Sequence, residues 1–288
     1  MTMLKQFNNA MRYIEENLTQ EIDSARLAQI AGCSEYHFGR MFSFLAQMPL
    51  GEYIRRRRLS IAGRMLQAKG ARVTDVALTL GYDSPEAFGR AFAAMHGVTP
   101  TAARRGAPLR AFAPMTFQLT VKGGIDMDYR IVQKQAFNLV GFKKQITAQF
   151  EGVNPQMAAL VEKLTPPVIA ELKALCDTEP RGILNVSANF EVRTAQDTLL
   201  DQYIAVATTQ AAPQGYDCLA VTAGSWAVFE VTGNYPQAMQ QTWAKIFSEW
   251  LPASGYTLAQ GPEILWNEGP DMSKPDYKSA IWIPVCQA

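Results

Sequence analysis

The chain has 288 residues, of which 48% are hydrophobic and 18% are charged, and its formal net charge at pH 7 is +1. This length exceeds the usual size of a single core, so two domains are expected, and the apolar content excludes a disordered chain. The first residues lack the continuous apolar core of a signal peptide, and no run of eighteen apolar residues occurs, so we expect a cytoplasmic protein.

The four cysteines are widely scattered and form no Cys-x-x-Cys pair: Cys33, Cys176, Cys218 and Cys286. Only His37 and His96 could join them as soft metal ligands. We therefore expect neither a metal site nor a structural disulfide, and the sequence indicates no cofactor.

The charge is unevenly divided near residue 110. Residues 1–110 carry fifteen Lys and Arg against nine Asp and Glu, a net charge of +6, whereas the remainder carries twelve against seventeen, a net charge of −5. A basic first part suits a phosphate backbone, which would repel an acidic second part. On charge alone, DNA binding and an ordinary uneven distribution of charge are about equally supported.

A short pattern occurs twice, about fifty positions apart, at residues 32–42 and 81–92. Each copy places a Gly before a Ser and then two Phe residues around an Arg. The matching residues are Gly32, Ser34, Phe38, Arg40 and Phe42, and Gly81, Ser84, Phe88, Arg90 and Phe92. Glycine at the turn and serine at a helix cap predict the turn and second helix of two helix-turn-helix units.

Helical spacing of apolar residues runs through the first hundred positions. It predicts a first helix from the spacing of Phe7, Met11, Ile14 and Leu18, and a second helix capped by Ser24. On the two reading helices, capped by Ser34 and Ser84, the apolar residues face inward. The side chains expected to face outward are Glu35, Tyr36, Gly39, Arg40 and Ser43 in the first copy, and Glu86, Gly89 and Arg90 in the second.

A longer helix is predicted between the copies, from about residue 50 to residue 69. At about 1.5 Å per residue it spans about 27 Å, which approaches the roughly 34 Å of one duplex turn. Two reading helices at its ends could therefore enter successive major grooves.

Four consecutive arginines, residues 55–58, lie within this helix. Successive helical residues point about 100° apart, so the four cannot all face one ligand. We expect one or two to fold back over the core or to pair with acids. For any single member, phosphate contact and a solvated position remain equally open.

The first hundred residues resemble the DNA-binding domain of the AraC/XylS family of bacterial transcription regulators. The resemblance is carried by Leu27-Ala28-x-x-Ala31-Gly32-x-Ser34, Phe38-x-Arg40-x-Phe42, Pro49-x-x-Tyr53-Ile54-x-x-Arg57-Arg58-Leu59, Val76-Ala77-x-x-x-Gly81-Tyr82-x-Ser84, Phe88-x-Arg90-x-Phe92 and Gly97-Val98-Thr99-Pro100-x-x-x-Arg104. It implies two helix-turn-helix units joined by a long helix, a double-stranded DNA partner and contact with RNA polymerase.

The resemblance also implies which residues touch DNA. The candidates are Tyr36, Gly39, Arg40, Ser84, Glu86 and Arg90. Arginine offers two donors to guanine, whereas Arg40 and Arg90 could instead hold phosphates or pair with an acid. Gly39 departs from the longer polar residue common in relatives, so the first unit is expected to read a narrower sequence.

The stretch from Arg104 to Pro114 is rich in Arg, Gly, Pro and Ala and is typical of a linker. After it, short β-branched and aromatic runs predict strands at residues 137–142, 203–207, 225–231 and 279–285. Helical spacing returns at residues 154–176, broken at Pro166-Pro167, and at residues 236–251. Strand, helix and strands, occurring twice, predict an antiparallel α+β domain of two similar halves.

Residues 126–287 resemble the GyrI-like effector-binding domain. The similarity is carried by Trp226-Ala227-Val228-Phe229-Glu230, the helix from Trp243 to Tyr256, Gly261-Pro262-Glu263 and Ile281-Trp282-Ile283-Pro284-Val285. It implies a cleft between the halves, lined with aromatic residues and carrying a glutamate, for a small amphipathic or cationic effector. The ligand-binding candidates are Tyr203, Trp226, Trp266 and Trp282 for the walls and Glu230 or Glu263 for the carboxylate.

Each of these candidates has a structural alternative, because a tryptophan on a strand is usually core and a strand glutamate usually faces solvent. Relatives often place an acid just before the final apolar strand, where this chain has Ala280. We therefore do not expect strict selectivity for cations.

The expected organisation is multidomain. It comprises an all-α double helix-turn-helix domain over residues 1–107, a linker over 108–125 and an α+β antiparallel-sheet domain over 126–288. The resemblance favours a ligand-responsive transcription activator that is not an enzyme. A small-molecule hydrolase fused to a DNA reader is the alternative. No Gly-x-Ser-x-Gly elbow or phosphate loop occurs, and neither histidine lies in the second half.

Overall fold

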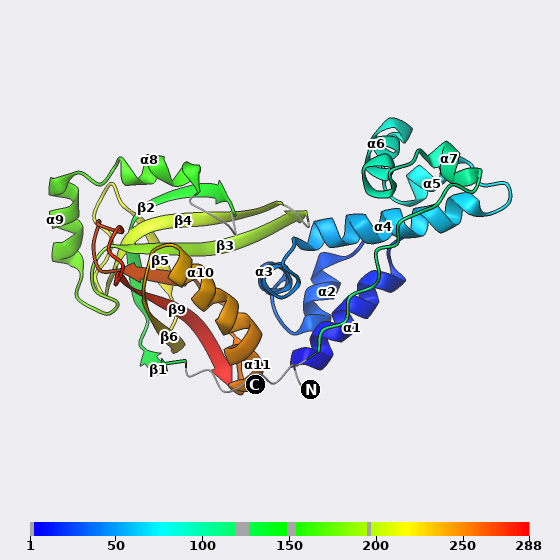
Figure 1. Ribbon diagram of the computed structural model, residues 1–288. Helices are drawn as coiled ribbons and strands as arrows, with labels where there is room; N and C mark the ends of the chain where they lie inside the picture. The colour runs from blue at the N-terminus through cyan, green and yellow to red at the C-terminus, as the bar shows by residue number, and fades with distance from the viewer. Residues whose placement is uncertain (1–2, 119–126, 149–153, 195–196, 288) are drawn as a thin grey trace. The chain divides into compact units, whose positions relative to one another are not determined.

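The computed structural model describes residues 3–118, 127–148, 154–194 and 197–287 (Figure 1). The chain divides into two compact units, Met1–Val121 and Lys122–Ala288. In the described residues the first unit is helical and the second is built on an antiparallel sheet. The expected fold class is therefore confirmed.

The described part of the first unit consists of helices joined by short turns. In chain order they are α1 (Met3–Glu16), α2 (Ser24–Ala31), α3 (Glu35–Ala46), α4 (Leu50–Gln67), α5 (Val73–Thr79), α6 (Pro85–His96) and α7 (Pro100–Arg104). The long helix predicted between the repeated patterns is α4.

The repeated pattern forms two helix-turn-helix units. In the first, Gly32 adopts a left-handed backbone with φ of 70° after α2, and the Ser34 side chain accepts an N–H group from the first turn of α3. In the second, Gly81 has φ of 76° after α5, and the Ser84 side chain accepts in the same way at α6. Both units thus use the turn and cap that the sequence predicts.

The expected cap of α2 is wrong. Asp23 caps this helix, because its carboxylate accepts the Arg26 N–H at 2.9 Å, and Ser24 is the first helical residue. Aspartate and serine are similarly favoured at a helix cap, and a carboxylate also interacts with the partial positive charge of the helix N-terminus. Because two capping residues are adjacent, the sequence leaves the start of α2 ambiguous by one position.

Residues 109–117, called the strap below, follow α7 and run along α4 and α1 (Figure 1). This segment was expected to belong to a linker. Leu109 packs against the core of the second helix-turn-helix unit. Phe117 exchanges two hydrogen bonds with Asn8, at 2.8 and 2.9 Å, and its ring meets Phe7 edge-on at 4.9 Å. The strap therefore contacts both α1, beside the first helix-turn-helix, and the core of the second helix-turn-helix.

The second unit contains one antiparallel sheet. Its strands are β1 (Tyr129–Lys134), β2 (Phe137–Thr147), β3 (Leu184–Thr194), β4 (Asp197–Thr208), β5 (Asp217–Val221), β6 (Gly224–Thr232), β7 (Tyr256–Leu258), β8 (Glu263–Asn267) and β9 (Lys278–Gln287). Their order is β1-β6-β9-β8-β3-β4-β2-β5, and β7 pairs with β9. The four predicted strands correspond to β2, β4, β6 and β9, so these predictions are confirmed.

The sheet consists of two halves with the same order of elements. A 3-10 turn (Pro155–Met157), α8 (Ala158–Val161) and α9 (Pro166–Leu175) separate β2 from β3 and β4. Similarly, α10 (Gln237–Lys245), a π-helical turn (Ile246–Trp250) and α11 (Leu251–Ala253) separate β6 from β8 and β9. The halves meet where β3 pairs with β8. Two similar halves were predicted, and this arrangement confirms them.

The two faces of the sheet have different neighbours. Trp250 packs edge-on against Phe229 at 4.8 Å between ring centroids, so the helical segment after β6 covers the face that carries Phe229. Because side chains alternate along a strand, Trp226 and Val228 lie on the opposite face. That opposite face holds the buried cluster described below.

In the described parts of the chain, no helix combines the length and the apolar character that crossing a bilayer requires.

Candidate functional site

The first reading helix, α3, presents Tyr36 and Arg40 one turn apart. Arg40 Nη1 donates a hydrogen bond to the Tyr36 hydroxyl at 3.1 Å, and its guanidinium lies 5.7 Å from the centre of the Tyr36 ring. The two side chains are only 7% and 8% exposed, although an outward position was expected. The aliphatic stem of Arg40 and the ring of Tyr36 pack against each other along the helix, and this contact accounts for part of the burial.

Gly39 lies between them on a surface with room for a side chain. A Cβ atom built there would meet no atom within 4 Å, and the same holds for Gly89 in α6. Both reading helices therefore carry a glycine at the corresponding position, although neither needs it for packing.

The second reading helix, α6, exposes its candidates more fully. Glu86 and Arg90 are exposed on its surface. The Ser84 hydroxyl oxygen accepts the Ala87 N–H at 3.1 Å, so Ser84 holds the first turn in place. The two arginines of the repeat thus have different surroundings, with Arg40 packed and Arg90 in solvent.

The four consecutive arginines of α4 all have partners within the first unit. Arg55 and Arg56 bond to Glu52, and Arg57 bonds to Glu15. The Arg55 hydrogen bond is the main reason that the pKa of the Glu52 carboxyl lies below its usual value. The expectation that some members pair with acids is confirmed.

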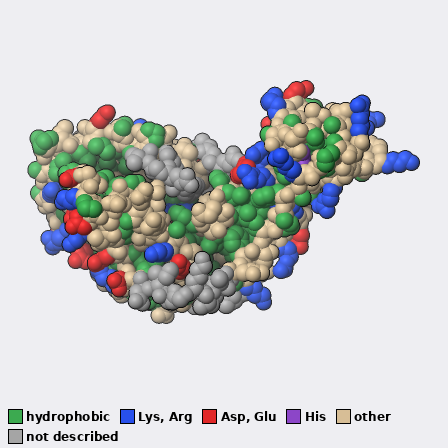
Figure 2. Space-filling view, in the orientation of Figure 1, with side chains coloured by type: hydrophobic (Ala, Val, Ile, Leu, Met, Phe, Trp, Pro, Cys, Tyr) green, Lys and Arg blue, Asp and Glu red, His purple; other side chains and the backbone are tan. Residues whose placement is uncertain are grey.

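The last of the four, Arg58, folds back over the helices. Its guanidinium donates to the carbonyl oxygens of Leu18 and Gln20, at 2.9 and 2.8 Å. Arg55 and Arg56 remain exposed on α4, and basic side chains are prominent on the visible surface of the helical unit (Figure 2). Phosphate contact is thus open to these two.

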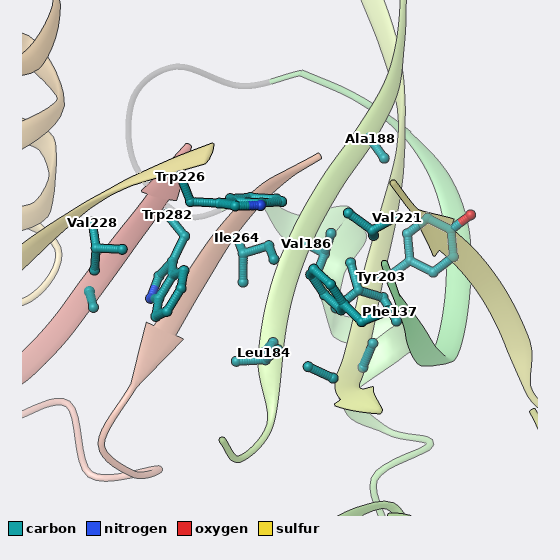
Figure 3. Packing of buried hydrophobic residues seen from close by; sticks show 14 residues of the cluster. Phe137, Leu184, Val186, Ala188, Tyr203, Val221, Trp226, Val228, Ile264 and Trp282 are labelled. Carbon is teal, nitrogen blue, oxygen red and sulfur yellow. The ribbon is translucent and has the colours of Figure 1, made fainter. Parts of the chain in front are cut away.

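In the second unit, three of the four aromatic candidates share one buried cluster (Figure 3). Tyr203 on β4, Trp226 on β6 and Trp282 on β9 belong to it, and Trp266 on β8 packs against it. Burial raises the pKa of the Tyr203 hydroxyl to about 12. The sheet face that carries this cluster is called the aromatic face below.

The two candidate carboxylates lie differently. Glu230 follows Trp226 and Val228 at intervals of two residues, so it points to the aromatic face, and its side chain is 76% exposed. Glu263 is buried and directly precedes Ile264, a member of the cluster, so alternation places it on the other face. Only Glu230 therefore shares a face with the aromatic candidates.

Two basic residues of the aromatic face were missed at the sequence level. Arg130 on β1 pairs with Val228, and its Cζ lies 5.3 Å from the centre of the Trp282 ring. Lys134 lies four residues further along β1, with Nζ 5.6 Å from the Phe137 ring centre. The signal was the two-residue spacing of Arg130, Val132 and Lys134, which places all three side chains on one face of a strand.

A search for groups of three or more His, Cys, Asp or Glu side chains that could hold a metal ion finds none in the described residues.

Two family models match the chain. A helix-turn-helix domain matches residues 27–106, and a GyrI-like small molecule binding domain matches residues 127–285. The second match covers more than half of the chain. The two matched ranges correspond to the helical unit and to the sheet unit.

Curated relatives are transcription regulators by name. The chain is 40% identical over 89 residues to the HTH-type transcriptional activator AarP of Providencia stuartii, covering 31% of this chain and 66% of AarP. It is 32% identical over 101 residues to the regulatory protein SoxS of Escherichia coli, covering 35% of this chain and 94% of SoxS. For the transcriptional regulator Rob of Salmonella typhimurium the identity is 35% over 100 residues, covering 35% of each protein. The chain thus spans just under two thirds of AarP and about a third of Rob.

Solved structures resemble each unit separately. The structure of SAV2435 bound to tetraphenylphosphonium is 23% identical, covers 56% of this chain and 94% of its own, and has a TM-score of 0.44. An AraC-type transcriptional regulator from Chromobacterium violaceum is 21% identical, covers 35% of this chain and 89% of its own, and has a TM-score of 0.33. No ligand assignment follows from similarity at this level. On the family matches, the chain belongs to the GyrI-like family of small-molecule binding domains and carries an AraC-type helix-turn-helix DNA-binding domain ahead of that domain.

Proposed function

We propose that the protein is a sequence-specific, DNA-binding transcription regulator whose second unit binds a small organic effector. The observation that carries this proposal is the paired arrangement of α3 and α6, each capped by a serine after a left-handed glycine turn. Helix α4 has 18 residues and a length of about 27 Å, which suits reading helices in successive major grooves.

The names of the relatives support activation rather than repression, since AarP is named an activator. In this proposal the protein acts in the cytoplasm, and RNA polymerase is its partner at the promoter. The proposal assigns no catalysis to the effector domain. Turnover of a reactive ester, abolished by changing one acid of the aromatic face, would instead favour a hydrolase.

In this proposal the reading residues are Arg90 and Glu86 in α6, with Arg40 and Tyr36 in α3. Arg90 is exposed and offers two parallel donors to a guanine. Gly39 leaves a gap in the first reading surface, and Ser84 positions α6 on the phosphate backbone through its cap. Because Arg40 is packed against Tyr36, we expect the second helix-turn-helix, which contains α6, to contribute more of the base discrimination.

Replacing Arg90 with alanine tests base reading. We expect Arg90→Ala to lose about 1–3 kcal/mol of discrimination at one base position, a factor of roughly 5 to 150, since a bidentate contact carries about that much. The measurement is fluorescence anisotropy on a site selected from random DNA and on its single-base variants.

Arg12→Ala is the matched control, because Arg12 is an exposed arginine on α1 and belongs to neither reading helix. An Arg90→Ala protein that loses affinity equally on every sequence would show phosphate contact instead. The same comparison applies to Arg40→Ala.

For the second unit we propose that the effector rests on the aromatic face, with Trp266 at its accessible edge. Trp226, Trp282 and Tyr203 are more deeply buried and form the floor. Glu230 is the candidate carboxylate beside the effector. Glu263, also a candidate from the sequence, lies on the other face of the sheet and is not part of this proposal.

A pair of tryptophan replacements on opposite faces tests the location. We expect Trp266→Phe to weaken binding of an amphipathic dye by roughly 2- to 5-fold, because the smaller phenyl ring keeps only part of an aromatic contact that contributes about 0.5–1.5 kcal/mol beyond the area buried. Trp243→Phe, on helix α10 behind the sheet, makes the same chemical change on the other side and serves as control. Equal loss in both variants, measured by dye fluorescence titration, would remove the effector from the aromatic face.

A further inference from the structure

The edge strand β1 places two basic side chains on the aromatic face. Within β1, Arg130 pairs with Val228, Val132 with Trp226 and Lys134 with Gly224. Val132 packs against the buried cluster, so the residues two positions before and after it point to the same side. Arg130 and Lys134 therefore stand about 13 Å apart along one face, at about 3.3 Å per residue.

Each of these cations lies over an aromatic ring of that face. The guanidinium carbon of Arg130 is 5.3 Å from the Trp282 ring centre, and the ammonium nitrogen of Lys134 is 5.6 Å from the Phe137 ring centre. Both distances are within the roughly 6 Å of a cation–π contact. The protein's own cations thus occupy ring positions that would otherwise stabilise a cationic ligand.

The acidic partners of these two residues are weak. Arg130 Nε is 3.9 Å from Glu230 Oε1, which is longer than a hydrogen bond, and both side chains are exposed, at 48% and 76%. Lys134 donates to the neutral hydroxyl of Thr178 at 2.8 Å. An anion that approached from solvent could therefore displace Glu230 from Arg130 and reach the ammonium group of Lys134.

The surroundings of Lys134 favour an anionic partner. Burial lowers the pKa of its ammonium group, and Glu179 opposes this effect only in part. An additional negative charge nearby would stabilise the charged form. A cationic ligand would have the reverse effect.

We propose that Arg130 and Lys134 determine the ligand preference of the aromatic face, which takes a small molecule with an anionic head group and an apolar body. This inference rests on the proposed function of that face as the effector site. A cation would have to displace Arg130 or Lys134 from the rings and would be repelled by both. An anion gains charge-assisted hydrogen bonds from the same two groups.

Two molecules with the same aromatic body and head groups of opposite charge test this preference. Naphthalene-2-sulfonate and 2-naphthyltrimethylammonium are titrated into the full chain by calorimetry. We expect the sulfonate to bind at least ten times more tightly, since its oxygens accept hydrogen bonds from both cations. In the double variant Arg130→Gln, Lys134→Gln, we expect this ratio to fall to about one or below, because the rings are released and the positive charges are gone.

Lys144→Gln is the matched control. Lys144 is exposed on β2 and pairs with Gln202, the neighbour of Tyr203, so it points away from the aromatic face. Lys144→Gln removes one positive charge from the other face and is expected to leave the ratio unchanged. Melting curves of all variants establish that the fold is retained.

The possible outcomes separate this inference from the proposed function. Tighter binding of the naphthylammonium ion by the unmodified chain, or an equal change of ratio in Lys144→Gln, overturns the inference and leaves an effector site intact. Absence of binding by both ions overturns the effector role of the aromatic face, and the inference with it.

Discussion

A chain that ends after residue 107 is expected to be less stable than one that ends after residue 118 by about 3–6 kcal/mol. Four apolar side chains of the strap are partly buried against the helices: Leu109, Phe112, Met115 and Phe117. Each contributes about half of the roughly 1.5–3 kcal/mol that full burial of such a side chain contributes. For a domain of this size the melting temperature shifts by roughly 4–8 °C per kcal/mol. Thermal denaturation followed by circular dichroism measures the difference.

The contacts of the strap explain why the loss is large. The Phe112 N–H group donates to Ser60 Oγ at 3.1 Å, and its ring lies 6.0 Å from that of Tyr53. The Met115 N–H group donates to the Tyr53 hydroxyl at 3.2 Å. These bonds are made to α4, and those of Phe117 are made to α1. The strap therefore fixes the helices of both helix-turn-helix units against each other.

The shorter chain is also expected to bind DNA more weakly. Two reading helices that are held in register meet successive grooves without further ordering, whereas units that move independently lose entropy on binding. In the full chain, Phe117→Ala should reproduce part of the loss, and Thr116→Ala, an exposed neighbour, should not. Equal melting of the two shortened chains would show that the strap contributes nothing to the helical unit.

The helices of the first unit could be predicted because their signals are local. Gly32 and Gly81 end one helix, and Ser34 and Ser84 begin the next within a few residues. The cap of α2 was misplaced by one position because two capping residues are adjacent. The strap could not be predicted in the same way, since its hydrogen bonds to α4 and α1 join residues 52 to 109 positions apart. Its Arg, Gly, Pro and Ala composition is typical of a linker.

Strands that are buried on both faces could be predicted from the sequence, because burial requires continuous apolar runs. The interior strands β2, β4, β6 and β9 contain continuous apolar runs and were predicted, whereas β1 and β3 are interrupted by polar residues and were not. For the same reason the tryptophans of the aromatic face were found, while Arg130 and Lys134 on β1 were missed. Whether Glu230 or Glu263 faces the aromatic side depends on strand register, which the separate sequence runs did not determine.

The other large effect is expected at Arg57, the third of the four consecutive arginines. Arg57→Ala should destabilise the helical unit by about 3–5 kcal/mol, because it leaves a partner charge behind in a largely buried site. Its guanidinium is almost completely buried and binds both carboxylate oxygens of Glu15, at 2.6 and 2.9 Å, and the backbone carbonyl of Phe112 in the strap. Urea unfolding measures the change.

Glu15, the partner of Arg57, also accepts a hydrogen bond from Tyr53, and this network allows a test with a double variant. The Tyr53 hydroxyl donates to the same Glu15 carboxylate at 2.6 Å, and burial, with this acceptor, raises the pKa of the Tyr53 hydroxyl. Removing both charged partners in Glu15→Gln, Arg57→Ala should therefore cost less than the sum of the single changes. Arg55→Ala is the matched control, since the Arg55 side chain of its ion pair with Glu52 is 43% exposed and the pair is expected to contribute about 1 kcal/mol or less. If Arg57→Ala and Arg55→Ala were equally mild, the link between α1, α4 and the strap would not depend on Arg57, and the strap would have to be held by its aromatic contacts.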